Sequence, residues 1–174
     1  EASFRTAAML TPSPALQAWN EFFLGRLAEE QGLLSQAIEQ YTQIWRVMPH
    51  WREVKYREIV CQVKMGFCEP ILDQLIKLIR EDPTYFNRVL IDPSLERGRL
   101  LILSALYDLW NEAKQCADTD RARVTEISNR LDTWFAPEHP VQLQLGMQVR
   151  DLEAQASINN YLAFLNIVEV RPGI

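Results

Sequence analysis

Apolar residues recur every three or four positions along almost the whole chain, and no sustained alternation of polar and apolar residues occurs. This spacing is typical of helices with one buried face, whereas a half-buried strand would alternate with a period of two. Only six glycines and nine prolines interrupt the pattern. The sequence therefore predicts an all-α protein.

Glycines and prolines mark the ends of the helices predicted in the first half. Gly32 and Gly66 suit the left-handed residue that ends a helix, and Pro49 and Pro83 cannot continue one. These signals predict helices over residues 14–31, 35–48, 51–65 and 69–81, after a helical segment over residues 3–10. The first half should therefore consist of short helices joined by tight turns.

Cap signals refine these boundaries. Ser13 and Ser35 are expected to cap the helices that follow them, because a serine hydroxyl can accept a hydrogen bond from a free backbone N–H of the first turn. Residues 84–91 predict a short helical turn that closes the first half. Asp92 is the expected cap of the next helix, with Pro93 in its first turn.

The second half has longer apolar stripes and fewer breaks. Helices are predicted over residues 94–116, 121–134 and 137–168, with a turn at residues 117–120. Such helices are typical of an antiparallel bundle or a coiled-coil extension. We therefore expect two domains, residues 1–91 with the short helices and residues 92–170 with the long ones.

The breaks in the first half repeat in phase. Gly32 and Gly66 are 34 residues apart, and so are Pro49 and Pro83. A helix-turn-helix period of this length is the signature of tetratricopeptide repeats. A first unit at about residues 18–51 carries the pattern of that family: Leu24, Gly25, Ala28, Gly32, Ala37, Tyr41 and Pro49.

Residues 1–91 thus resemble the tetratricopeptide repeat family. A second unit at about residues 52–85 is degenerate, because Glu58 and Ile59 replace the Leu-Gly pair and Ile71 replaces the small residue. The resemblance implies an α-solenoid of helical hairpins. It also implies that the first helix of each hairpin lines a concave groove that binds an extended peptide or a helix of a partner.

Transferred position by position, the resemblance gives ten groove residues: Trp19, Phe22, Arg26, Glu29, Glu30, Glu53, Tyr56, Val60, Val63 and Lys64. One subgroup of the family grips a C-terminal carboxylate with Lys, Asn and Arg. Phe22 and Arg26 occupy two of those places here, so we do not expect binding to chaperone tails. Trp19 and Phe22 could equally pack inside the protein, since aromatic stripes on helices usually belong to the core.

Charge and cysteine content narrow the class of protein. The net charge is −5 and no basic block occurs, so nucleic acid is not an expected ligand. No apolar run is long enough to span a bilayer. Three cysteines do not suggest a disulfide framework, which favours the cytoplasm. Because the chain starts at Glu1, we expect a fragment of a longer protein, or a mature form whose signal peptide was removed.

The sequence offers little catalytic or metal-binding equipment. His50 and His139 each lie beside a proline and have no second ligand at a metal-like spacing. Cys61 and Cys68 flank the Gly66 turn and are better explained as packed thiols than as a redox pair. No glycine-rich phosphate loop is present. We therefore expect neither an enzyme nor a cofactor.

These observations leave two hypotheses for the function. In the first, the chain is a protein–protein interaction scaffold that binds a peptide or helix, either of another protein or of its own parent chain, through the concave face. In the second, it is a structural self-assembly element in which the long C-terminal helices form a homo-oligomer.

Overall fold

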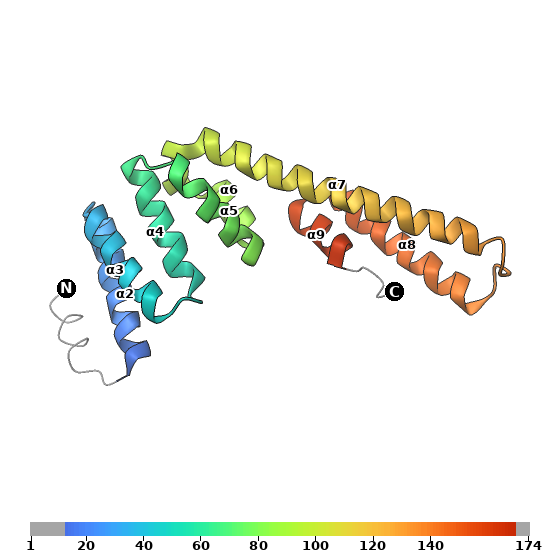
Figure 1. The fold of residues 1–174 in the computed structure, drawn as a ribbon, viewed down its shortest axis with the longest axis horizontal. Coiled ribbons are helices and arrows are strands. Elements are labelled where there is room, and N and C mark those ends of the chain that lie inside the picture. The colour runs from blue at the N-terminus through green and yellow to red at the C-terminus, as the bar shows by residue number, and fades with distance from the viewer. Residues whose placement is uncertain (1–12, 170–174) are drawn as a thin grey trace. The chain divides into compact units, whose positions relative to one another are not determined.

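The computed structural model describes residues 13–169, and every regular element in that range is helical (Figure 1). The predicted all-α class is confirmed, whereas the helical segment expected over residues 3–10 lies outside the described residues. Two compact units divide the chain, Glu1–Ala105 and Leu106–Ile174, with the boundary inside helix α7 (Arg99–Leu131). Each unit is described below by itself.

The first unit consists of short helices. These are α2 (Pro14–Glu30), α3 (Leu34–Val47), α4 (Arg52–Met65), the 3-10 turn η1 (Glu69–Ile71), α5 (Leu72–Glu81), α6 (Tyr85–Ile91) and the 3-10 turn η2 (Pro93–Gly98). The four helices and the short terminal helix predicted from the sequence all form. Gly32 and Gly66 have φ angles of 74° and 99°, so the predicted left-handed helix ends are present.

The predicted caps are only partly right. Ser13 occupies the cap position of α2 without a capping hydrogen bond from its side chain. Ser35 lies inside α3, whose cap position is Leu33, because the helix begins earlier than the serine suggested. Asp92 does cap η2, where its Oδ1 accepts a hydrogen bond of 2.8 Å from the Ser94 backbone N–H.

Small residues let α2 and α3 cross closely. Ala37 and Tyr41 of α3 are fully buried. A Cβ atom placed on Gly25 of α2 would lie 2.7 Å from Cε1 of Tyr41, so only glycine leaves room for this ring. The core of the first unit around this crossing contains Ala18, Phe22, Ala28, Ala37, Tyr41, Ile44, Val54 and Cys61. The hairpins are therefore well packed, while their arrangement as a solenoid stays a prediction.

The second unit contains most of α7 together with α8 (Pro140–Ile158) and α9 (Tyr161–Glu169). The turn predicted at residues 117–120 is wrong, because α7 is continuous through it. The Thr119 hydroxyl donates to the Gln115 carbonyl at 2.8 Å, and Arg121 pairs with Asp118 at 3.2 Å. Polar residues of this stretch thus bond along the helix, and neither glycine nor proline breaks it.

The single last helix predicted over residues 137–168 is also wrong. Asn159 ends α8 in the left-handed conformation with φ 54°, and the Asn160 side chain accepts a hydrogen bond of 2.8 Å from the Ala163 N–H. One asparagine therefore stops a helix and the next one caps another. In α9, Phe164 packs edge-on against Trp110 of α7, with ring centroids 5.8 Å apart.

The crossing of α2 and α3 yields a stability prediction. Gly25→Ala should lower the free energy of unfolding by about 1–3 kcal/mol, because the new methyl group meets the buried Tyr41 ring. Gly146→Ala is the matched control: its Cβ would meet nothing within 4 Å, and better helix propensity should raise stability by up to about 1 kcal/mol. Urea unfolding followed by circular dichroism measures both. Equal stability of the Gly25 variant and wild type would contradict the close crossing.

Candidate functional site

Helix α2 carries an exposed apolar stripe beside its buried face. Leu16, Trp19 and Phe23 keep 56%, 46% and 45% of their surface exposed, at positions that fall on one side of the helix. Phe22 is buried on the neighbouring side. Of the two aromatic residues predicted for the groove on this helix, Trp19 is therefore exposed, whereas Phe22 belongs to the core.

Trp19 is held in place by neighbouring rings. Its ring centroid lies 4.3 Å from that of Trp51 and 6.3 Å from that of Phe22, against which it packs edge-on. The ring centroids of Phe22 and Trp51 are 4.8 Å apart. Sequence reasoning did not include Trp51 in the site, although this tryptophan is the first residue of the helix predicted over residues 51–65. The stripe thus presents an aromatic side chain that is fixed on one face and open on the other.

A buried carboxylate lies at the centre of the predicted site. The Glu29 side chain has no exposed surface and accepts hydrogen bonds from three cations. Arg57 donates from Nε at 3.1 Å and from Nη2 at 2.7 Å, and Lys64 donates from Nζ at 2.8 Å. Arg26 donates from Nη1 at 2.7 Å, and the Tyr41 hydroxyl lies at 3.3 Å. One carboxylate therefore joins α2, α3 and α4.

The cations around Glu29 remain partly open to solvent. The side chains of Arg26 and Lys64 are each 32% exposed, and Arg26 also pairs at 3.1 Å with the exposed Glu30. Partial burial works against the charged form of Arg26, but Glu29 outweighs it and holds the pKa of the guanidinium above its usual value. The predicted residues Arg26, Glu29, Glu30 and Lys64 thus come together, and with Arg57 the cluster holds three cations and two carboxylates.

The residues predicted on α4 do not line an open groove. Tyr56, Val60 and Val63 have no exposed surface. The Tyr56 hydroxyl donates to Asp92 at 2.6 Å, and the Arg88 guanidinium lies 4.2 Å from the centre of its ring. Helix α6 and the turn after it cover this side of α4, so the expectation of an open face is wrong at these three positions.

The remaining residue predicted on α4, Glu53, is engaged by α6. Both its carboxylate oxygens accept hydrogen bonds from the Arg88 guanidinium, the second at 2.8 Å, and the Tyr85 hydroxyl lies 3.4 Å away. The hydrogen bonds to Glu53 raise the pKa of Arg88. This pairing is bidentate and charge-assisted, which is the stronger kind of ion pair. The Arg88–Glu53 pair holds α6 against α4 at a position where the repeat pattern predicted contact with a binding partner.

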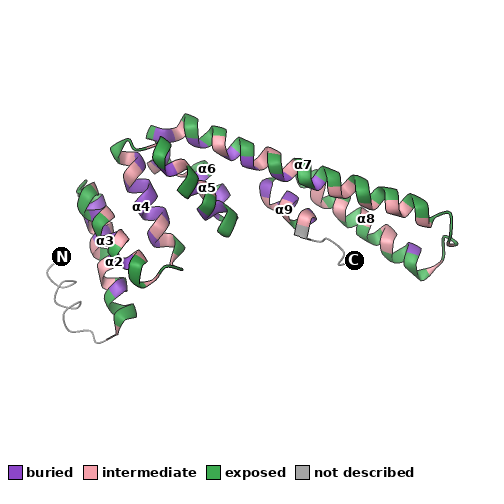
Figure 2. Cartoon of the chain, viewed as in Figure 1, coloured by how far each residue is buried: buried purple, intermediate pink, exposed green. Residues whose placement is uncertain are grey.

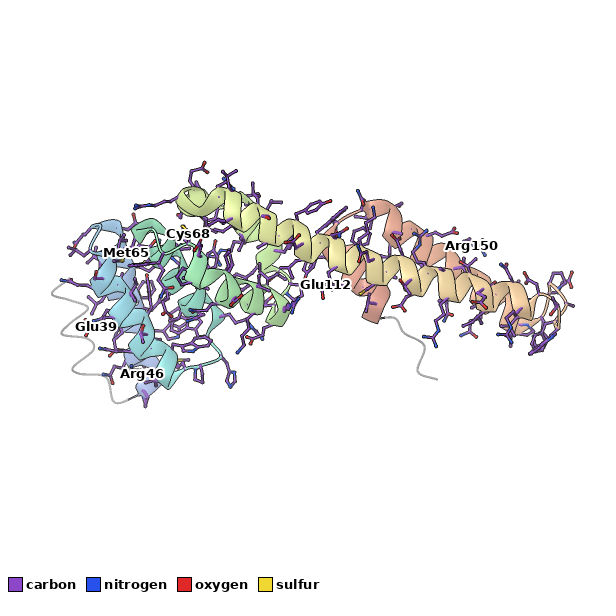
Figure 3. All side chains as sticks on the ribbon, turned by 45° about the horizontal axis from the view of Figure 1, so that its top comes forward. Glu39, Arg46, Met65, Cys68, Glu112 and Arg150 are labelled. Atoms are coloured by element: carbon purple, nitrogen blue, oxygen red, sulfur yellow. The ribbon has the colours of Figure 1, made fainter. Side chains whose placement is uncertain are left out.

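An uncharged hollow lies on another part of the first unit, near the turn between α4 and η1 where Figure 3 labels Met65 and Cys68. Its volume is about 410 Å³. The lining residues are Ser35, Ile38, Gln62, Met65, Phe67, Pro70, Ile71 and Gln74. None of the ten predicted groove residues belongs to this set.

Comparisons with protein-family models, with curated proteins and with solved structures give no match for this chain. The resemblance to tetratricopeptide repeats therefore stays a prediction from the sequence. Among residues 13–169, no helix is both long and apolar enough to cross a membrane. In the same residues, no group of three or more His, Cys, Asp or Glu side chains is arranged to hold a metal ion.

The Glu29 cluster predicts a large effect of one substitution. Glu29→Gln should lower the free energy of unfolding by about 3–5 kcal/mol, because Arg57 and two further cations lose their buried counter-charge. Glu30→Gln is the control and should change stability by less than about 0.5 kcal/mol, since that side chain is exposed. Urea unfolding measures the difference, and similar losses in both variants would show that Glu29 does not organise the cluster.

Alkaline pH should weaken the first unit. Burial raises the pKa of the Cys61 thiol from 9.0 to about 12, and burial also raises the pKa of Tyr85 from 10.0 to about 12. Both folded-state pKa values exceed the unfolded ones. The stability that the two protonated groups contribute is therefore fully present below the unfolded pKa values, and it is lost as pH rises toward the folded pKa values.

Urea midpoints measured from about pH 8 to pH 11 should therefore fall with pH, and Cys61→Ala should make the fall shallower. Cys116→Ala, at an exposed thiol, should leave the slope unchanged. Identical slopes for wild type and the Cys61 variant would contradict the assignment of this pH dependence to the buried thiol.

Proposed function

We propose that the chain is a protein–protein interaction scaffold whose binding surface is the exposed stripe of α2. The observation that carries the proposal is Trp19, an aromatic side chain that is 46% exposed although the rings of Trp51 and Phe22 hold it in place. A fixed aromatic side chain supplies a large contact area at a low cost in conformational entropy, and such residues dominate the binding energy of interfaces.

The stripe has the dimensions and the chemistry of a helix-binding face. Leu16, Trp19 and Phe23 form its apolar part, and Arg26 with Glu30 forms its charged end. From Leu16 to Glu30 the helix rises about 21 Å. We therefore propose an amphipathic helix or peptide as the partner, with apolar side chains that cover the aromatic part and charges that fix its register.

The proposal assigns a binding role and not a catalytic one. The buried Glu29 is surrounded by hydrogen-bond donors, and its oxygens are therefore engaged rather than free to act as a base. The neighbouring Glu58 pairs with Lys55 at 3.0 Å. Cys61, Cys68 and Cys116 are free thiols, and the cytoplasmic location expected from the small number of cysteines stays a prediction.

Selection of displayed random peptides on the intact chain tests the proposal. We expect enriched peptides with apolar residues at helical spacing, and Trp19→Ala should weaken their binding at least about tenfold, as for a central interface residue. Fluorescence anisotropy with the synthetic peptides measures this affinity.

Leu33→Ala is the matched control, because Leu33 is 44% exposed but lies in the turn before α3. Circular dichroism of each variant establishes that it is folded. The proposal is wrong if selection enriches no peptide, or if the selected peptides bind the Trp19 and Leu33 variants equally well.

A further inference from the structure

The second unit has a packed core at one end and none at the other. Where α9 is present, Leu106, Leu109, Ala113 and Ala117 of α7 are buried, and so are Tyr161, Ala163, Phe164 and Ile167 of α9. From Asp118 to Asn160, Gln142 is the only buried residue (Figure 2). The end without a third helix is therefore an open two-helix hairpin.

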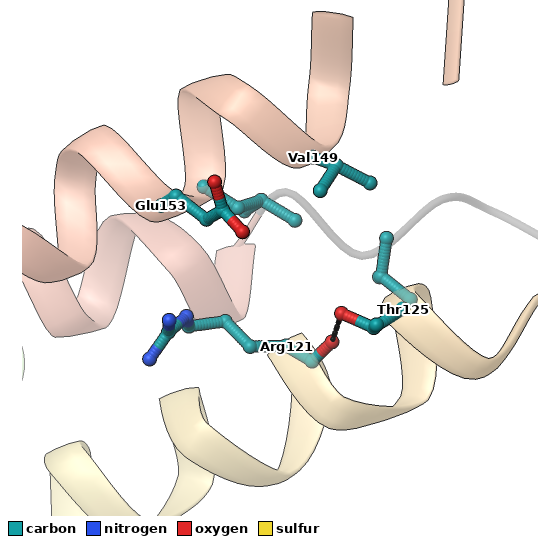
Figure 4. A pocket seen from close by; sticks show the side chains of 6 residues that line it. Arg121, Thr125, Val149 and Glu153 are labelled. Atoms are coloured by element: carbon teal, nitrogen blue, oxygen red, sulfur yellow. Dashed lines mark hydrogen bonds between the residues drawn. The ribbon is translucent and has the colours of Figure 1, made fainter. Parts of the chain in front are cut away.

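The contact between α7 and α8 in this hairpin, called its seam below, is only partly packed. Side chains of α7 and α8 surround a small space here (Figure 4). Its volume is about 20 Å³, and its lining residues are Arg121, Val124, Thr125, Val149, Leu152 and Glu153. Such a space holds about one water molecule. Val124, Val149 and Leu152 are all partly exposed. Because helices in water depend on packing of their apolar face, this hairpin gains little stability from its own seam.

The outer side of α8 carries a second apolar stripe. Leu143, Met147 and Ile158 are 57%, 62% and 55% exposed. With the exposed Ala154 they fall on one face of the helix, opposite the half-buried residues that face α7. Leucine, methionine and isoleucine side chains aligned in this way form a patch of the kind that marks an interaction surface.

This stripe is complementary to itself. In an antiparallel pair of α8 helices with a two-fold axis between Arg150 and Asp151, Leu143 faces Ile158 of the second copy. Met147 then faces the small Ala154, and Arg150 faces Asp151. Apolar side chains thus meet apolar ones, a large residue meets a small one, and opposite charges meet at the axis.

The charges at the centre of the stripe are available for such pairing. Arg150, labelled in Figure 3, is exposed and donates its Nε to the Gly146 carbonyl at 3.1 Å. Its η amino groups have no acceptor among residues 13–169. Asp151 is also exposed and forms no ion pair with another described residue.

We propose that two copies of the chain associate through α8, antiparallel, with the two-fold axis between Arg150 and Asp151. The contact is a single helix pair about 22 Å long, so the dimer is weak, with a dissociation constant that is roughly micromolar or higher. This proposal concerns only the second unit and goes beyond the peptide-binding role of α2. Either can fail without the other.

Sedimentation velocity of the intact chain across the micromolar range tests the dimer. We expect a concentration-dependent shift from monomer to dimer. Met147→Glu should abolish that shift, because it places a charge in the apolar contact. Val141→Glu is the matched control, since Val141 is 42% exposed on another side of the same helix and should leave the shift unchanged.

A charge exchange tests the axis. Arg150→Asp alone and Asp151→Arg alone each place like charges opposite one another twice, and each should weaken association about tenfold. The double variant with both substitutions restores opposite charges across the axis and should recover wild-type association. Circular dichroism establishes that each variant is helical.

Three results would overturn the proposal. The first is a wild-type chain that stays monomeric at every concentration, and the second is association that Met147→Glu leaves intact. The third is a double charge variant that associates as weakly as the single ones, because this would exclude the antiparallel register. Trp19→Ala should leave association unchanged, which separates this result from that of the peptide experiment.

Discussion

The hydrogen bonds that converge on Glu29 are the interaction on which the first unit depends. A carboxylate without exposed surface carries a large desolvation cost, and Arg57, Lys64 and Arg26 offset it with four charge-assisted hydrogen bonds. These donors come from α2 and α4, and Tyr41 adds α3. The cluster therefore fixes how α2 lies on its neighbours, which in turn determines that Trp19 stays exposed while Phe22 is buried.

Helices α2 and α4 occupy corresponding places in the repeat pattern, but they differ in how far their outer faces are covered. The outer face of α4 is covered by α6, where Arg88 lies over the Tyr56 ring and binds Glu53. Helix α2 has no such cover over Leu16 and Trp19 among the described residues. The physical difference is a short helix that follows the second hairpin and packs back on it. The proposed binding surface is therefore confined to α2 and does not extend over the ten positions that the repeat pattern indicated.

Local signals in the sequence were sufficient for the helices of the first half. Glycine at a left-handed position and proline after a helix act through their own backbone, so Gly32 and Gly66 could be read directly. The turn predicted at residues 117–120 was wrong because the polar run Asp118–Asp120 resembles a turn in sequence. Its hydrogen bonds along the helix, such as that from Thr119 to the Gln115 carbonyl, cannot be read from the sequence. Burial of Tyr56 and Val60 could not be read, since it depends on a helix about 30 residues away folding back. The role of Glu29 likewise arises only when Arg57 and Lys64 approach from another helix.

Native-state hydrogen exchange tests most directly whether Glu29 makes α2, α3 and α4 one cooperative body. If it does, the slowest amides of the three helices open with the same free energy, because breaking the cluster releases all of them together. Substitution of Glu29 by Gln should then lower that free energy equally in each helix. Slow amides of α2 that open at a clearly lower free energy than those of α4 in the wild-type chain would contradict the account.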